Sequence, residues 1–234
     1  EAKTKMSNTY RVIVIGGGVV GSSVLYHLAK LGWTDVCLLE RSVLTAGSSW
    51  HAAGGIHALN ADPNMASLQA YTIDLLSEIQ TESGQDIGLS MTGGITVASA
   101  PARWEWLQSA YRIFQTIGIE DCYLMTPQDI KDKCPIMDIS GVLGGLWCDR
   151  EGYVDTTGTV HAYAGAAKKR GATVIEHTKV EELRQRKDGS WDVITDQGEF
   201  HAEHVVNAGG LWAKQVGRMV GLDLPLSPLE HHYL

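Results

Sequence analysis

Short apolar runs alternate with longer amphipathic stretches along the chain, and this pattern predicts an α/β protein. Residues 10–15 (YRVIVI) form a β-rich apolar run, residues 21–31 place apolar side chains at helical spacing, and residues 35–40 (DVCLLE) form a second apolar run. We therefore expect the first forty residues to form a β-α-β unit. A poorly periodic stretch rich in Gly, Ser and Ala follows over residues 42–62.

The remainder of the chain mixes helices and strands. Helices are predicted at 65–84, at 101–117 with a proline in the first turn, from 126 with Thr126 as N-cap, at 157–169 and from about 212. Strands are predicted at 95–99, 143–147, 153–155, 173–176, 180–186, 191–195 and 199–207. The late segments are of the kind that completes the opening β-α-β unit, whereas the middle of the chain suggests an inserted domain.

Composition narrows the class of protein only slightly. The chain has 234 residues, a formal net charge of −8, 44% hydrophobic and 20% charged residues, close to the average for globular proteins. No apolar run approaches the roughly 18 residues of a membrane span, and the acidic balance argues against nucleic acid or an anionic membrane as a partner. The polar N-terminal residues carry no secretory signal pattern. The four cysteines lack a CxxC pair, so we expect free thiols.

A glycine-rich motif follows the first predicted strand. Gly16, Gly18 and Gly21 form GxGxxG at the start of the first predicted helix, and Glu40 ends the second strand. Such glycines allow a tight turn, close approach of the backbone to a pyrophosphate and close packing of helix on strand, while the helix N-terminus attracts the phosphates. A carboxylate at Glu40 suits ribose hydroxyls and repels a 2′-phosphate, so NADP is disfavoured. The motif itself leaves NAD and FAD open.

The stretch after the second strand contains few bulky residues. It runs TAGSSWHAAGG over residues 45–55, where small side chains let the backbone lie against a long cofactor and hydroxyls can donate to phosphates. A histidine in such a loop, here His51, is more often a polar surface residue than a functional one, so these residues alone assign it no role.

Three stretches together resemble the dimethylglycine and sarcosine dehydrogenase family, which belongs to the D-amino-acid-oxidase-like FAD enzymes. They are YRVIVIGGGVVGSSVLYHLAKLG, VCLLERSVLTAGSSWHAAGG and HVVNAGGLWAKQVGRMVGL. The resemblance implies FAD attached covalently to His51 through the flavin 8α-methyl group. It implies further cofactor contacts at Gly16, Gly18, Gly21, Glu40, Arg41, Ser48, Ser49, Ala53, Gly54, Val180, Ala208 and Gly209.

The resemblance also implies the fold and its division. We expect a Rossmann-like FAD-binding domain of the GR2 or D-amino-acid-oxidase type, formed by residues 9–84 and 151–221. An α+β substrate domain is expected at residues 85–150. Residues 222–234 are expected to begin a return into that domain and to stop within it, because the chain ends on LEHHYL without a helix or cap. We therefore expect a fragment that is incomplete at its C-terminus.

A tandem histidine pair near this end carries the remaining catalytic prediction. Alignment on Tyr233 places His231 where the family has a histidine above the flavin ring, with His232 as a substitute. A histidine with a near-neutral pKa suits the removal of a proton from the substrate amine. The alternative is a solvent-exposed pair. His201 and His204 point to opposite faces of a strand, so we expect no metal site there.

The resemblance implies an FAD-dependent oxidoreductase that demethylates dimethylglycine, sarcosine or a similar N-methyl amino acid. Hydride passes to the flavin, and electrons then pass to an electron-transfer flavoprotein or to oxygen. Tetrahydrofolate is implied only with a C-terminal domain outside these residues. The expected location is the cytoplasm in a bacterium or the mitochondrial matrix in a eukaryote. The alternatives are a non-catalytic FAD-binding module or half-enzyme that needs a partner chain, and an NAD-dependent dehydrogenase, which would leave TAGSSWHAAG without a purpose.

Overall fold

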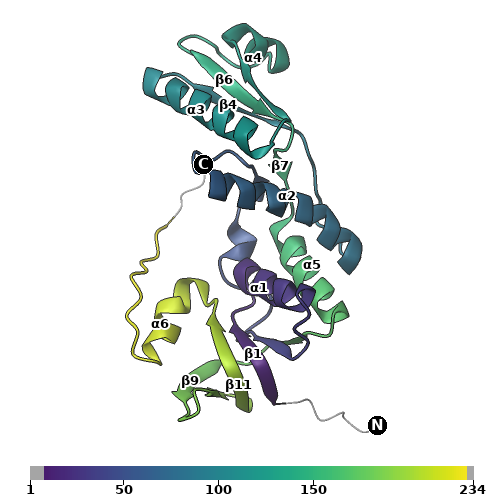
Figure 1. The fold of residues 1–234 in the computed structure, drawn as a ribbon, viewed down its shortest axis with the longest axis vertical. Coiled ribbons are helices and arrows are strands. Elements are labelled where there is room, and N and C mark those ends of the chain that lie inside the picture. Colours follow the sequence, from purple (N-terminus) through teal and green to yellow (C-terminus); the bar gives the residue numbers. More distant parts are fainter. Residues whose placement is uncertain (1–7, 231–234) are drawn as a thin grey trace. The chain divides into compact units, whose positions relative to one another are not determined.

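The computed structural model describes residues 8–230, which divide into two compact units (Figure 1). The described residues of Glu1–Ala53, together with Ile79–Ile87 and those of Thr156–Leu234, form the first unit. Gly54–Glu78 and Gly88–Asp155 form the second. The mixed α/β class predicted from the apolar pattern is confirmed. Among the described residues, no helix combines the length and apolar character required to cross a membrane.

The first unit is built on a six-stranded sheet in the order β8-β2-β1-β11-β10-β9. Its strands are β1 (Thr9–Ile15), β2 (Val36–Leu39), β8 (Thr173–Ile175), β9 (Val180–Gln185), β10 (Trp191–Thr195) and β11 (Gly198–Asn207). The four strands from β8 to β11 are parallel, and β11, β10 and β9 are antiparallel to one another. The parallel strand β2 is buried throughout, as expected for a strand covered on both faces.

Helices cover this sheet and connect its parallel strands. They are α1 (Val19–Lys30), α5 (Thr156–Lys169) and α6 (Ala213–Arg218), with short 3-10 turns η1 (Ser49–His51) and η2 (Gly210–Trp212). Helix α1 packs against α5 through small residues, among them the buried Gly21 and Ala162. Val216 of α6 joins the apolar cluster formed by Ile13, Leu39 and Phe200 of the sheet. The β-α-β start predicted for the first forty residues is confirmed.

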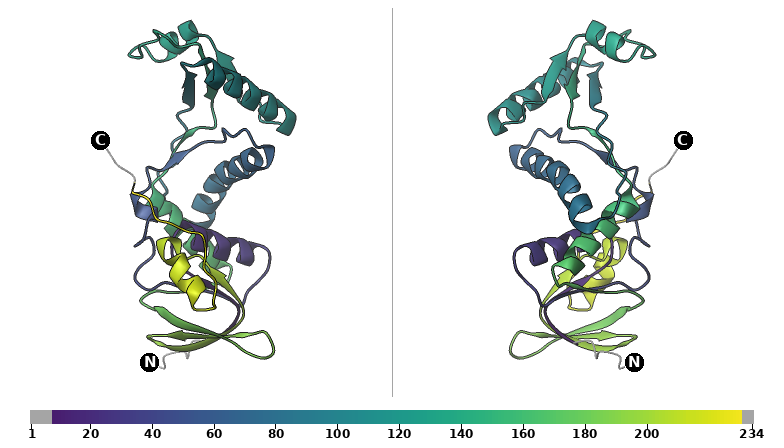
Figure 2. Two further views of the ribbon diagram at one scale, coloured as in Figure 1. Left: turned by 90° about the vertical axis from the view of Figure 1, so that its left-hand side faces the viewer. Right: turned by 90° about the vertical axis from the view of Figure 1, so that its right-hand side faces the viewer.

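The second unit has an antiparallel sheet of its own, in the order β4-β6-β5. Its elements are β3 (Gly55–Ile56), β4 (Gly94–Ala98), α3 (Pro101–Ile117), β5 (Cys122–Met125), α4 (Pro127–Lys133), β6 (Gly144–Cys148) and β7 (Gly152–Tyr153). Helix α3 contacts all three strands of the sheet (Figures 1 and 2). Thr126 caps α4 in a capping box with Asp129, as its sequence predicts.

The division into units differs from the predicted segments at two places. Helix α2 (Pro63–Ser83) contributes to both units, since the border falls between Glu78 and Ile79. Residues 54–78, predicted within one segment at 9–84, belong to the second unit. The reason is a pairing that the sequence pattern does not reveal: β3 forms a two-stranded antiparallel ladder with β7. Residues 151–155, predicted with the late segment 151–221, lie in the second unit for the same reason.

The expectation of four free cysteines is wrong for two of them. Cys122 and Cys148 are directly paired across the antiparallel strands β5 and β6, with Cα atoms 4.1 Å apart, and they form a disulfide. Both lie buried in the core of the second unit. Cys37 and Cys134 are free. Since 26 positions separate the bonded cysteines, no local spacing rule identifies them.

We predict that the thiols differ strongly in reactivity. Burial raises the pKa of the Cys37 thiol to about 12, so almost none of it is thiolate at pH 8. Cys134 is half-buried at the end of α4. Mass spectrometry after iodoacetamide treatment of the native protein should therefore show label on Cys134 only. Denaturation should add Cys37, and reduction should then add Cys122 and Cys148. Rapid native labelling of Cys37 would contradict this assignment.

Candidate functional site

A cavity of about 570 Å³ opens in the first unit at the carboxyl ends of its parallel strands. Strands β2 and β11 flank β1 there, and the segments that follow each strand contribute walls. Ligands of open parallel sheets bind at this edge. The cavity brings together most of the predicted cofactor residues: Gly16, Gly18, Glu40, Arg41, Ser48, Ser49, Val180, Ala208 and Gly209.

The turn from β1 into α1 tolerates only glycine at two positions. Gly16 has φ +114°, and a Cβ there would overlap the carbonyl oxygen of Ala208. A Cβ on Gly21 would overlap the carbonyl oxygen of Gly16, so any side chain at Gly21 would push α1 away from the turn. The bare backbone therefore forms a cradle that a long, phosphate-bearing ligand can approach closely.

The carboxylate of Glu40 is held in position by the backbone. Its Oε2 accepts from the N–H of Gly17 at 2.7 Å, and its Oε1 accepts from the N–H of Ser42 at 2.8 Å. Each carboxylate oxygen retains a further lone pair, so the group can still accept a hydrogen bond from a hydroxyl in the cavity. The role that the sequence suggests, a contact to ribose, is compatible with this geometry.

Ser49 connects the loop after β2 with the start of α1. Its Oγ accepts from the N–H of Val19 at 2.9 Å, and Val19 is the first residue of the twelve-residue helix. The N-cap residue, Gly18, offers no side chain to cap the helix. The N-terminal N–H groups and the positive end of the helix dipole thus face a cavity in which a hydroxyl already marks an acceptor position. This donor set fits the phosphates of a dinucleotide.

Four predicted cofactor residues are not among those that line this cavity. Gly21 lies buried beneath the turn, and its role is to let the helix pack. His51 ends η1, is exposed, and stacks on the ring of Trp50 with ring centroids 3.8 Å apart. Ala53 is exposed, and Gly54 belongs to the second unit. His231 lies outside the described residues, as does His232.

The cavity also contains residues that the sequence analysis did not assign. Asn207 and Trp212 line it and lie on either side of the predicted pair at 208 and 209. Asn207 Oδ1 accepts from the N–H of Gly209 at 3.1 Å, and its Nδ2 donates to the carbonyl of Ala213 at 2.8 Å. This side chain therefore braces the turn between β11 and α6. The signal was present in the VNAGG stretch, as an asparagine two residues before a glycine turn.

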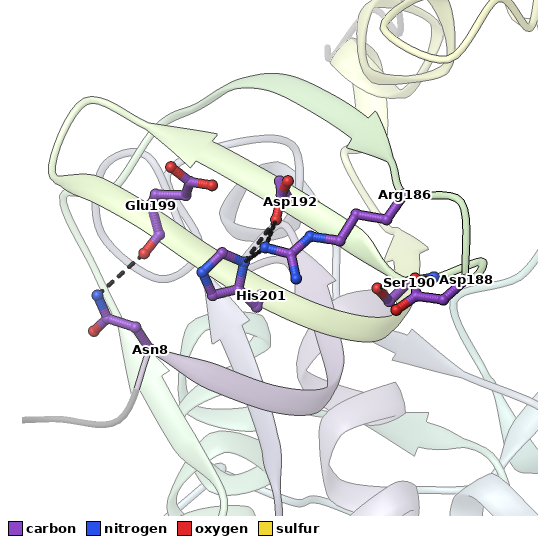
Figure 3. A network of polar contacts seen from close by, with 7 residues as sticks. All are labelled: Asn8, Arg186, Asp188, Ser190, Asp192, Glu199 and His201. Atoms are coloured by element: carbon purple, nitrogen blue, oxygen red, sulfur yellow. Dashed lines mark hydrogen bonds and ion pairs between the residues drawn. The ribbon is translucent and has the colours of Figure 1, made fainter.

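A second cluster of polar residues lies on the antiparallel strands β10 and β11 (Figure 3). Donor atoms of Asp192, Glu199 and His201 lie within 4.8 Å of one another, as in metal sites. However, the guanidinium of Arg186 forms an ion pair with Asp192, and His201 Nδ1 lies 2.7 Å from the same carboxylate oxygen. The hydrogen bond from Arg186 is the main reason that the pKa of Asp192 lies below its ordinary value. A cation of the protein itself thus already compensates this carboxylate.

A carboxyl in the second unit should make stability depend on pH. Burial raises the pKa of Glu151, although His57 opposes the effect, and the side chain lies against the backbone of Gly94. A raised carboxyl pKa favours the protonated form in the folded state. Its contribution is complete below the pKa of the unfolded state and is lost as the pH rises through the folded-state pKa.

We therefore predict that Glu151→Gln stabilises the protein at pH 7.5 but not at pH 4. The expected gain in melting temperature is about 2–4 °C, the shift that ~1 kcal/mol produces in a chain of this size. Thermal melting of both proteins at the two pH values checks this. An equal effect at both values would show that burial of the charged form is not the cause. Glu181→Gln, on an exposed side chain, is the matched control.

Comparisons with known proteins agree with this geometry. The family model described as "DAO: FAD dependent oxidoreductase" matches residues 11–234. The chain is 38% identical to human mitochondrial dimethylglycine dehydrogenase over 235 aligned positions, which cover 100% of the chain and 27% of that enzyme. It is 35% identical to human mitochondrial sarcosine dehydrogenase, covering 98% of the chain and 26% of that enzyme. The chain thus spans about a quarter of the length of these relatives.

Among solved structures, L-proline dehydrogenase from P. horikoshii superposes with a TM-score of 0.84 at 26% identity. The match covers 93% of this chain and 57% of that protein. The cradle at Gly16 and Gly21, the fixed carboxylate at Glu40 and the donor set at the start of α1 therefore occur in a chain whose similarity extends over almost its whole length.

Proposed function

Since the chain belongs to the DAO family of FAD-dependent oxidoreductases, we propose that it binds FAD in the cavity of the first unit and oxidises an N-methylated amino acid. The fold is of the D-amino-acid-oxidase type. The observation that carries the proposal is the cavity itself, in which a glycine cradle, a helix N-terminus and a fixed carboxylate meet at the ends of parallel strands. FAD, when bound, supplies the acceptor for a hydride from the substrate.

The residues of the cavity divide the recognition of FAD between them. Gly16 and Gly18 admit the pyrophosphate, and the N–H groups of α1 donate to it together with the hydroxyl of Ser48. Glu40 accepts from the ribose hydroxyls, and its charge excludes a 2′-phosphate. Val180 lies at the adenine end, while Ala208 and Gly209 approach the flavin.

Two histidines carry the finer part of the proposal. An imidazole nitrogen of His51 is attached to the flavin through the 8α carbon, and η1 presents that side chain at the surface. His231 holds the proton released from the substrate amine, so that the amine is neutral when the C–H bond breaks.

The proposed substrates are dimethylglycine and sarcosine, on which the two human relatives act by name. Electrons leave to an electron-transfer flavoprotein or to oxygen, and folate enters only with a further domain. Because the chain spans about a quarter of these relatives, a second function is kept: an FAD-binding module that is completed by a partner chain.

Anaerobic titration of the purified protein tests both functions. Dimethylglycine or sarcosine should bleach the absorbance of the bound flavin, whereas glycine, which lacks an N-methyl group, should not. Bound flavin that none of these compounds bleaches, although dithionite does, would favour the non-catalytic module. A protein that binds no flavin when FAD is supplied would contradict the proposal at its base.

A further inference from the structure

The cavity contains one stacked pair that connects two of its walls. The guanidinium carbon of Arg41 lies 3.8 Å from the ring centre of Trp212, and both residues line the cavity. Arg41 follows β2, whereas Trp212 ends η2 after β11. Because β2 and β11 lie on either side of β1, the pair spans the carboxyl end of β1, beside the turn that begins at Gly16.

The indole is the anchored member of this pair. Asn207 braces the turn that carries it, through its bonds to Gly209 and Ala213. Gly210 adopts φ +53°, which places η2 directly after this brace. The far edge of the ring faces the backbone of Gly47, where a Cβ would lie 3.4 Å from Cζ3 of Trp212. The indole is therefore held from two sides.

The guanidinium, by contrast, is exposed and carries a charge that no carboxylate of the described residues neutralises in a salt bridge. The other basic residue on the lining, Lys179, lies 3.5 Å from the carboxylate of Glu181. Stacking on an aromatic face leaves the N–H edges of an arginine available for a bidentate bond to phosphate. Arg41 thus offers the cavity a cation with its plane already oriented.

We propose that Trp212 is a positioning residue that acts through Arg41: it holds the guanidinium over the cavity, ready to bind the pyrophosphate of FAD. This inference rests on the proposed function, because it assumes that the cavity takes an adenosine diphosphate group. A side chain oriented before binding loses less rotamer entropy on binding, so the stack strengthens the arginine–phosphate contact without touching the ligand.

The test measures binding of ADP and of adenosine to the flavin-free chain by calorimetry. Arg41→Gln should weaken ADP binding about tenfold, since it removes a charge-assisted contact. Trp212→Leu should weaken it about fivefold, the scale of an exposed cation–π contact. Trp212→Phe, which keeps an aromatic face, should remain within about twofold of the wild type. The double variant Arg41→Gln/Trp212→Leu should bind ADP no more weakly than Arg41→Gln alone.

Adenosine separates positioning from a general effect on the cavity wall, because it lacks the pyrophosphate. Its affinity should be the same in the wild type and in all four variants. The matched control is Trp33→Leu, which removes a similar stack, Arg11 on Trp33 at 4.1 Å, outside the cavity residues. This control should bind ADP as the wild type does. Thermal melting confirms that each variant is folded.

Three results would overturn the inference. They are unchanged ADP affinity in Trp212→Leu, an equal loss of ADP and adenosine affinity in that variant, and additive losses in the double variant. Failure of the proposed function gives a different result, since the wild-type chain would then bind neither ADP nor FAD.

Discussion

Gly21→Ala is expected to destabilise the protein and to abolish stable FAD binding. The new methyl group would overlap the carbonyl oxygen of Gly16, and neither backbone can give way without moving α1 from β1. Overpacking of this kind costs about 1–3 kcal/mol. The melting temperature should therefore fall by roughly 3–10 °C. The N–H groups at the start of α1 would leave their positions, so FAD affinity should fall at least tenfold.

A second helical glycine gives the matched control. Gly165 lies in α5 of the same unit, and a Cβ there would meet Ser83 at 3.5 Å, an ordinary contact. Gly165→Ala should keep FAD affinity, and its melting temperature should be unchanged or higher because alanine favours helix over glycine. Thermal melting and FAD titration of both variants provide the measurement. Equal behaviour of the two variants would show that the close contact at Gly21 is not required.

His51→Ala is expected to remove covalently bound flavin completely while leaving dissociable FAD. The cavity is lined by residues before and after η1 but not by His51, so the surfaces that hold the dinucleotide remain in the variant. After acid denaturation and gel electrophoresis, flavin fluorescence should travel with the wild-type polypeptide and be absent from the variant. The native variant should still be yellow after mild purification with added FAD.

The control for this experiment is His57→Ala. His57 is another exposed histidine, six positions along the chain, but it follows the short strand β3 in the second unit. Its removal should leave the fluorescent band intact. Fluorescence that persists in His51→Ala, or that is lost in His57→Ala alone, would move the attachment site. A wild-type protein whose flavin is fully released by acid would show that FAD is not covalently bound.

The glycine motif illustrates how much of the site can be predicted from local sequence. Gly16, Gly18 and Glu40 line the cavity as the motif predicts, because a short strand, a tight turn and a helix start depend on contiguous residues. The sequence also identifies Ala208 and Gly209, through their resemblance to a known stretch. It does not identify Asn207 or Trp212, whose importance depends on hydrogen bonds across a turn and on a stack with a residue from another segment.

The second unit illustrates the limit of such prediction. Helix α3 and the capping box of α4 follow from periodicity and from Thr126. The pairing of β3 with β7 involves two strands of two residues each, too short to give an alternation signal. This pairing moves residues 54–78 out of their predicted segment. The disulfide between Cys122 and Cys148 has the same origin, since it depends on the register of β5 against β6.

The sequence by itself determined the α/β class, the β-α-β start and the glycine cradle, because backbone sterics and apolar periodicity act between residues that are close along the chain. The tertiary structure decided which strands are neighbours, which cysteines are bonded and which indole supports Arg41. These features depend on contacts between distant segments, and such contacts form only when the burial of a shared core brings the segments together.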